Sequence, residues 1–285
     1  MTDTLLQMPA ARGLYVKALG TARRKPGKNI RVPQIEVRVP AVQPTPSRLA
    51  AYREICGFEL APDELPITFP QVQAAPLHMW LMLRPEFPAP LMGLVHIRNS
   101  FEMLAPMTAE MAYDVRAALA DGRRTHQGYE IDLVTEYADG AGQIVYRALM
   151  TVLYRMKTDG PPLRPKPAAP APSLSEYRSF DVPSDIGRRY APIGGDFNPI
   201  HLYALTAKAF GFPRAIAHGM WSLARAAALV ETSRGKAART LSVQFRQPLL
   251  LPGKVALKFT NAGSGSDFAL LSRTSDKVHF TGRLG

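Results

Sequence analysis

The sequence predicts an α+β fold in which two related units each wrap an antiparallel β-sheet around a central helix. Segments that alternate apolar and polar residues recur through most of the chain, as expected of half-buried strands. Two of them are similar, GLVHIRNSFEMLAPM and TLSVQFRQPLLLPG, and each reaches an apolar-Pro turn, at Pro106 and at Pro252. The turns lie about half the chain apart, so a duplicated unit is the economical interpretation.

In the first half, an alternating segment at residues 30–40 predicts a strand, and SRLAAYREICG predicts a helix that ends at Gly57. The run PLHMWLML is almost entirely apolar and predicts a short buried helix. Further strands are expected at Gly93–Met103, Met111–Ala118, His126–Ala138 and Gln143–Met156.

The second half is expected to open with two helices. The first runs from Pro199 to Phe210 and is stopped by Gly211 as its C-terminal cap. The second begins near His218-Gly219 and continues to about Glu231, and its small apolar residues imply deep burial. Strands are then expected at Thr240–Gln247, Lys254–Asn261, Phe268–Thr274 and Val278–Arg283.

A proline-rich stretch, KTDGPPLRPKPAAPAPS, separates the two halves and is typical of an extended linker. We therefore expect a first unit at residues 1–156, a linker at 157–175 and a second unit at 176–285.

The stretch YAPIGGDFNPIHLYALTAKAFGFPRAIAHGM carries the residue types of a chemical site. Asn198 is a preferred N-cap and Pro199 suits the first helical position, so the chain passes there from a loop into a helix. Asp196 lies in the loop and His201 in the first helical turn, and such a junction can direct both side chains into one cavity. A simple capped turn is the alternative interpretation, and a His-Gly downstream, at His218, argues against it.

An Asp and a neutral His that face one cavity can hold and deprotonate a water molecule. The start of the second helix can stabilise an anion, because its first N–H groups have no partner within the helix. Gly219 is the natural donor there, since no side chain shields its amide. Water activation beside an oxyanion site suits hydration of an α,β-unsaturated thioester, which passes through an enolate.

This stretch resembles the hydratase motif of the MaoC-like family, the (R)-specific enoyl-thioester hydratases and 3-hydroxyacyl-thioester dehydratases with a hot-dog fold. The family pattern is an aromatic residue, then a small residue and Gly-Asp-x-Asn-Pro-aliphatic-His, followed by a His-Gly at the start of the central helix. Gly194 departs from the pattern, which often has Ser or Thr there, but no proposed catalytic group is lost. The matching residues are Tyr190, Gly195, Asp196, Asn198, Pro199, Ile200, His201, His218 and Gly219.

The resemblance implies a double hot-dog fold and a hydro-lyase. Asp196 and His201 would be catalytic, holding and deprotonating the water that attacks C3, and the N–H of Gly219 would bind the thioester carbonyl. The residues expected to bind substrate are Tyr190, Asn198, His218 and Met220.

The first half contains no Asp-x-Asn-Pro-x-His, so the resemblance implies a degenerate unit that accommodates the acyl chain. Its large apolar residues would either shape an acyl tunnel or form ordinary core; they are Phe69, Trp80, Met82, Met92 and Phe101.

The net charge of +12, from 35 Lys and Arg against 23 Asp and Glu, favours anionic partners. For a thioester enzyme these are the phosphates of coenzyme A or an acidic acyl carrier protein. The densest basic segment, Thr21 to Arg31, is interpreted as a solvated arm or as a surface for an acyl carrier. Nucleic acid is disfavoured, because no aromatic residues interleave with these charges.

Cys56 is the single cysteine, which excludes an internal disulfide and favours a reducing cytoplasm. No apolar run reaches the length of a membrane span or of a signal peptide core, so we expect a cytoplasmic protein without stable membrane insertion. No ligand spacing indicates a metal site and no glycine-rich loop indicates a nucleotide, so neither a metal nor a cofactor is expected.

We therefore predict reversible hydration of trans-2-enoyl thioesters to (3R)-3-hydroxyacyl thioesters carried by coenzyme A or acyl carrier protein. The alternative is a noncatalytic subunit that binds acyl thioesters beside a partner. A monomer and a homodimer are both compatible with the sequence, because a duplicated chain can pair its two units internally.

Overall fold

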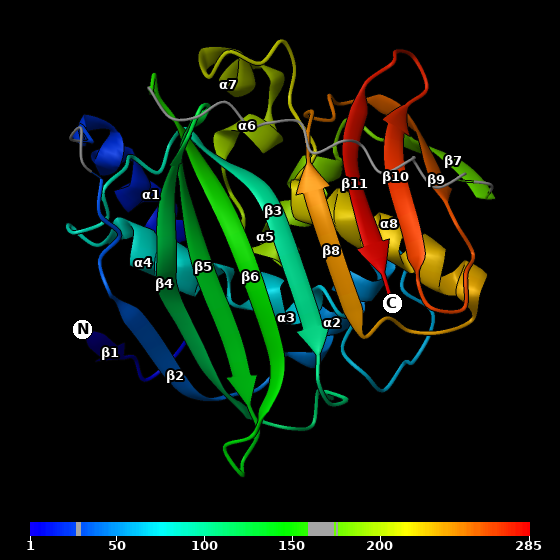
Figure 1. The fold of residues 1–285 in the computed structure, drawn as a ribbon, viewed down its shortest axis with the longest axis horizontal. Helices are drawn as coiled ribbons and strands as arrows, with labels where there is room; N and C mark the ends of the chain where they lie inside the picture. Colours follow the sequence, from blue (N-terminus) through cyan, green and yellow to red (C-terminus); the bar gives the residue numbers. More distant parts are fainter. Residues whose placement is uncertain (27–29, 159–173, 175) are drawn as a thin grey trace.

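The computed structural model describes residues 1–26, 30–158, 174 and 176–285. The strands of these residues form one 11-stranded sheet, and most of the helices lie against one of its faces (Figure 1). The strands are β1 (Thr2–Thr4), β2 (Glu36–Val42), β3 (Leu94–Met103), β4 (Tyr113–Thr125), β5 (Gly128–Ala138), β6 (Ile144–Arg155), β7 (Glu176–Val182), β8 (Thr240–Phe245), β9 (Gly253–Phe259), β10 (Ser266–Ser272) and β11 (Val278–Leu284). The helices are α1 (Ala11–Gly20), the 3-10 helix η1 (Thr21–Arg23), α2 (Pro46–Cys56), α3 (Phe69–Gln73), α4 (Ala75–Leu83), α5 (Ile186–Gly194), α6 (Pro199–Leu202), α7 (Ala204–Ala209) and α8 (Gly219–Arg234).

One strand order occurs in both halves of the sheet. From the outer edge to the centre, the first half runs β2-β4-β5-β6-β3, with β1 outside β2, and the second runs β7-β9-β10-β11-β8. The two innermost strands, β3 and β8, pair antiparallel with Ser100 opposite Ser242. Each of these strands lies within one of the two similar passages of the sequence, so the fold has the duplication that those passages predict.

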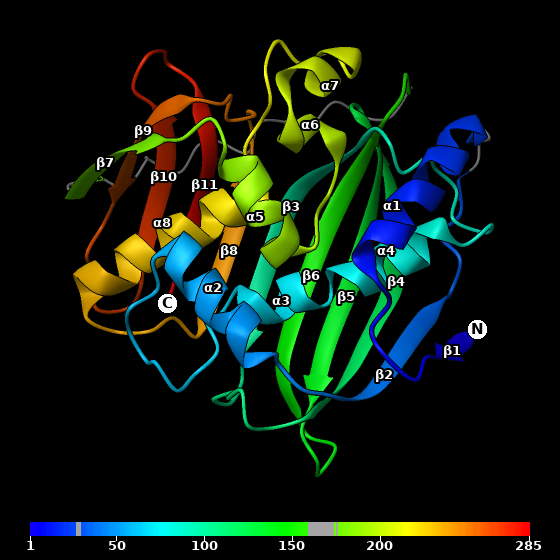
Figure 2. The ribbon, with the colours of Figure 1, turned by 180° about the vertical axis from the view of Figure 1, so that it is seen from behind.

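The helices lie against one face of the sheet (Figure 2), and apolar side chains are buried between the two layers. α8 crosses the second half and buries Trp221, Leu223 and Val230. α3 and α4 take the corresponding place in the first half, where Leu77 and Leu81 have no exposed surface. Burying a side chain of this size stabilises a fold by about 1.5–3 kcal/mol. No helix among the described residues is long and apolar enough to cross a membrane.

The single helix expected from Pro199 to Phe210 is wrong, because the chain forms two short helices, α6 and α7, separated by extended backbone at Tyr203. Side chains donate hydrogen bonds to carbonyls that would accept backbone N–H groups in a continuous helix. The hydroxyl of Thr206 donates to Pro199 O at 2.6 Å, and a guanidinium nitrogen of Arg188 donates to Leu202 O at 3.1 Å.

Two sequence expectations concern segments that lie partly outside the described residues. The linker at 157–175 includes residues 159–173 and 175, and the basic segment from Thr21 to Arg31 includes 27–29. Within the basic segment, Arg24 is not part of a solvated arm. Its guanidinium donates to the carbonyls of Met82, Leu83 and Arg84 at 2.8, 2.6 and 2.9 Å, where α4 ends.

Candidate active site

The chain bends sharply between α5 and α6, and this bend carries Asp196, the first residue of the site. α5 ends at Gly194 and is capped by Gly195, whose φ of 71° lies in the left-handed region that favours glycine. Asn198 is the N-cap of α6, as its sequence predicts, and its side-chain oxygen accepts from the N–H of Ile200 at 3.4 Å. Asp196 lies between these two residues, and its Oδ1 accepts the N–H of Asn198 at 3.0 Å.

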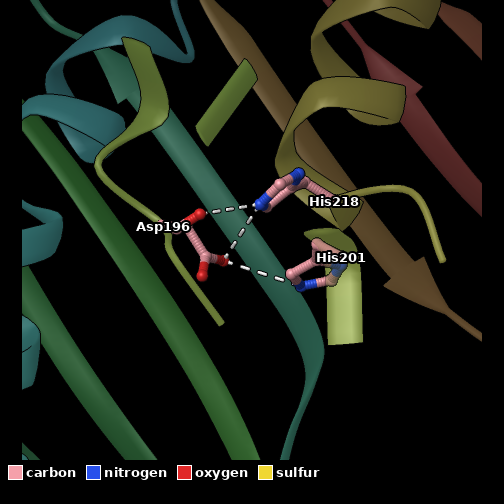
Figure 3. Close-up of side chains that lie close together, drawn as sticks. All are labelled: Asp196, His201 and His218. Atoms are coloured by element: carbon pink, nitrogen blue, oxygen red, sulfur yellow. Dashed lines mark hydrogen bonds and ion pairs between the residues drawn. The ribbon is translucent and has the colours of Figure 1, made fainter. Parts of the chain in front are cut away.

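Three side chains meet at this bend (Figure 3). Asp196 Oδ2 lies 3.8 Å from Nε2 of His201 on α6 and 3.9 Å from Nε2 of His218, the N-cap of α8. The two imidazole rings stack with their centroids 3.9 Å apart. The side chains of His201 and His218 are 10% and 2% exposed, whereas that of Asp196 is 37% exposed, so the carboxylate forms the accessible side of the cluster.

Backbone carbonyls fix the tautomer of both histidines, since a carbonyl can only accept a hydrogen bond. His201 donates from Nδ1 to Ile216 O at 2.9 Å, and His218 donates from Nε2 to the carbonyl of Asp196 at 2.9 Å. In this tautomer the Nε2 of His201 carries no hydrogen and faces the Asp196 carboxylate.

The surroundings keep Asp196 ionised and His218 neutral. Burial, and to a smaller extent the neighbouring His201, lower the pKa of His218 to about 3 against the raising effect of Asp196. Burial acts to raise the pKa of Asp196, but His218, His201 and hydrogen bonds from Tyr15 and Asn198 outweigh it, so the pKa lies below its ordinary value. At neutral pH the cluster thus contains a carboxylate beside a neutral imidazole.

The gap between Asp196 and His201 suits a third atom. At 3.8 Å, Oδ2 and Nε2 are too far apart for a direct hydrogen bond, yet one water molecule between them can donate a hydrogen bond to each. Such a water would be held by an anion and a base together, the arrangement that general-base catalysis requires.

Gly219 begins α8 directly after His218, so its N–H has no carbonyl partner one turn earlier in the helix. A Cβ at this position would lie 3.2 Å from the ring of Phe245, at the end of β8. His96 of β3 also packs against that ring, with centroids 4.9 Å apart. The amide therefore lies where the central strands of the two halves meet.

Tyr190 and Met220 are also expected from the sequence to bind substrate, and they are buried to different extents. Tyr190 is 1% exposed and lies behind the site, with its ring centroid 5.0 Å from that of His218. Met220, in the first turn of α8, is partly buried against the core. A Cβ on Gly194 would lie 2.4 Å from the Tyr190 ring, so a Ser or Thr at this position would require the ring to move.

The donor atoms of Asp196, His201 and His218 all lie within 4.8 Å of one another, a geometry that could hold a metal ion. The Nε2 hydrogen of His218 is already committed to the carbonyl of Asp196, so a metal ion at that nitrogen would have to displace this bond.

Tyr15 of α1 is a site residue that sequence reasoning missed. Its hydroxyl donates to Asp196 Oδ1 at 2.6 Å, across 181 positions of sequence. No motif or spacing links the two residues, and only the folded chain brings them together.

An open cavity of about 590 Å³ lies beside the stretch that leads into α8. Leu249 is among its lining residues, and its carbonyl accepts the N–H of Ala217, two positions before Gly219. Arg214, Lys254 and Lys277 give the lining a positive charge.

Comparison with known proteins identifies the family. Residues 167–280 match the family model described as MaoC like domain. Over 255 residues the chain is 32% identical to 3-hydroxyacyl-thioester dehydratase X of Mycobacterium tuberculosis. This alignment covers 88% of this chain and 89% of that protein. The chain belongs to the MaoC-like dehydratase family.

Solved structures support the MaoC-like assignment. The crystal structure of HtdX from Mycobacterium tuberculosis at 2.4 Å resolution aligns with a TM-score of 0.74 and 30% identity, covering 87% of this chain and 98% of that chain. Another protein of that organism, described as having a double hotdog fold, aligns with a TM-score of 0.54 and 10% identity over 86% of this chain and 92% of that chain. The predicted family, the double hot-dog fold and the assignment to the hydro-lyases are confirmed.

Proposed function

We propose that this protein reversibly hydrates trans-2-enoyl thioesters to (3R)-3-hydroxyacyl thioesters. Asp196 and His201 hold a water molecule, and His201 Nε2 accepts a proton as the water oxygen bonds to C3. The C2–C3 double bond becomes a single bond, and the resulting enolate oxygen is stabilised by the N–H of Gly219. A proton returned to C2 by the same pair completes the addition, and dehydration follows these steps in reverse.

The observation that carries this proposal is the convergence of Asp196 Oδ2 and His201 Nε2, 3.8 Å apart, beside the first amide of α8. The pair supplies a base and an anion to one water, and the helix start supplies a donor to an oxyanion. The related protein named 3-hydroxyacyl-thioester dehydratase X supports 3-hydroxyacyl thioesters as the substrate class.

We further propose that the chain divides as the sequence predicts, with a first unit at residues 1–156 that accommodates the acyl chain and a second unit at 176–285 that performs the chemistry. The contact of His96 with Phe245 supports the role of the first unit, because the ring of Phe245 also lies beside Gly219. Within the proposed acyl wall, Phe69 and Phe101 are fully buried, whereas Trp80, Met82 and Met92 are partly exposed.

For the carrier, we propose that the basic lining of the 590 Å³ cavity binds phosphate groups of coenzyme A or of an acyl carrier prosthetic group. Arg214, Lys254 and Lys277 outnumber the single carboxylate of the lining, Asp181. Opposite charge of this kind concentrates an anionic substrate at the site.

The test of the proposed function follows the loss of enoyl-thioester absorbance with short- and long-chain trans-2-enoyl-CoA, with the product resolved by stereochemistry. Parent protein should form the (3R) alcohol, and Asp196→Asn should not. Asp276→Asn, an exposed carboxylate in the turn between β10 and β11, is the matched control and should retain parent activity. Binding of the thioester without turnover on either carrier would instead favour the noncatalytic subunit.

A further inference from the structure

α1 covers the catalytic loop, although it lies near the start of the chain. The Cβ that Gly195 lacks would lie 3.7 Å from Ala11 Cβ, so the helix starts directly over the bend. The guanidinium of the next residue, Arg12, lies 5.0 Å from the centroid of the Phe197 ring. Tyr15 meets the same ring edge-on, with centroids 6.3 Å apart and an interplanar angle of 77°.

The contact that matters chemically is the hydrogen bond from the hydroxyl of Tyr15 to Asp196 Oδ1 at 2.6 Å. The N–H of Asn198 donates to the same oxygen at 3.0 Å. An Asp side chain rotates easily about its last torsion, so two donors on Oδ1 are what hold Oδ2 toward His201 and His218.

The segment that carries Tyr15 is fixed to the first half of the molecule. Besides the three bonds from Arg24 to the end of α4, the hydroxyl of Thr21 accepts the N–H of Leu91 at 3.0 Å. The same hydroxyl donates to Ala18 O at 2.7 Å and so joins the end of α1 to this anchor. Tyr15 is therefore held by the first half of the molecule and contacts the catalytic loop of the second half.

A phenol donor to a carboxylate is a charge-assisted hydrogen bond and favours the ionised carboxylate. Burial and the charge of Asp196 raise the pKa of Tyr15 well above its ordinary value, so the hydroxyl stays protonated and remains a donor. The bond therefore persists wherever the Asp196 carboxylate is ionised.

We propose that Tyr15 is a positioning residue of this site, whose hydroxyl fixes Asp196 Oδ1 and thereby sets the direction of the carboxylate that holds the water. The role in turnover rests on the proposed function. The role in holding Asp196 can be measured without turnover.

The decisive variant is Tyr15→Phe, which keeps the ring on Phe197 and removes only the hydroxyl. We expect kcat to fall roughly tenfold to a hundredfold, the usual effect of losing a group that orients a reacting side chain, with KM little changed. Because Asp196 loses a donor to its ionised form, its pKa rises and the acid limb of the kcat/KM profile moves to higher pH. Tyr177→Phe removes the hydroxyl of an exposed tyrosine on β7 and is the matched control.

A second readout is the titration of the Asp196 carboxyl carbon by NMR in aspartate-labelled protein, assigned with Asp196→Asn. It should titrate at higher pH in Tyr15→Phe than in the parent. If the parent turns over and Tyr15→Phe retains its kcat and acid limb, the positioning role is overturned while the proposed function stands. If no enoyl thioester is turned over, the proposed function fails, and an unchanged Asp196 titration would then overturn the role of Tyr15 as well.

Discussion

The Nδ1–H of His201 donates to the carbonyl oxygen of Ile216 at 2.9 Å, and this bond turns Nε2 toward Asp196. Ile216 is itself held in place, since its N–H donates to Ile200 O at 3.1 Å and it forms a β-bridge with Leu250. The orientation of the base is thus set by backbone, which does not depend on substrate.

The first prediction separates this orientation from base strength. His201→Asn can keep a donor to Ile216 O while removing Nε2, and we expect its turnover to fall by about 10²–10⁴-fold, the usual contribution of a general base. Circular dichroism and Tm should stay close to parent values, which confirms that the loss is chemical. Residual activity within tenfold of the parent would remove His201 from the proposed mechanism.

The second prediction concerns the oxyanion donor. In Gly219→Ala the new Cβ would lie 3.2 Å from the Phe245 ring, so one of the two must shift. We expect kcat to fall, by less than the roughly 10²–10³-fold that loss of a whole donor costs, because the N–H remains. Adding Phe245→Leu should make room and restore part of kcat. If the double variant is no better than Gly219→Ala, contact with this ring is not the cause of the loss.

The third prediction tests the cavity as a carrier site. Lys254→Glu combined with Lys277→Glu reverses two charges of its lining and should raise KM for enoyl-CoA roughly fivefold to tenfold at low salt, with kcat unchanged. The matching enoyl-pantetheine, which has no phosphate, should be unaffected. Lys236→Glu, an exposed residue just beyond the far end of α8, is the control variant. An equal rise in KM for both substrates would contradict a phosphate contact.

The fourth prediction is a pH dependence of stability. Burial raises the pKa of Glu231 on α8 to about 7, against the lowering effects of the Ala238 N–H and of nearby Arg53. The folded protein therefore binds a proton that the unfolded chain has released between about pH 4.5 and 7, and this contribution to stability is lost as pH rises.

Glu231→Gln keeps an acceptor for Ala238 and removes the titration. Relative to this variant, the parent should lose on the order of 3 kcal/mol of unfolding free energy between pH 4.5 and pH 8. Urea denaturation at both pH values measures it. Parallel stability curves for the two proteins would place the pKa of Glu231 near its ordinary value.

Local sequence signals were enough to predict much of this molecule. Alternation predicted β3 and β8 and the strands that follow each of them, and the glycine at position 57 marked the end of α2, where φ is 77°. The motif from Asp196 to His201 predicted the N-cap and the meeting of carboxylate and imidazole, because all of its parts lie within one turn of chain.

The features that were missed depend on partners far away in sequence. At the break near Tyr203, Arg188 donates a hydrogen bond to Leu202 O, and Arg24 donates to a carbonyl at the end of α4. α5 contains Pro192 inside the helix, a residue that normally argues against helix at that position. The Tyr15 hydroxyl has no local signature, since an exposed tyrosine and one aimed at a carboxylate look alike in sequence.

β3 and β8 pair within one chain, so the interface between the two halves forms without the association of two separate chains. Dilution cannot separate the halves, so Tyr15 and Asp196 stay together at any protein concentration. Under the division of labour proposed above, the same covalent link means that the first half needs no catalytic residues of its own, because it is always joined to a half that has them. Substitutions in the first half can then change what it binds without removing the catalytic residues.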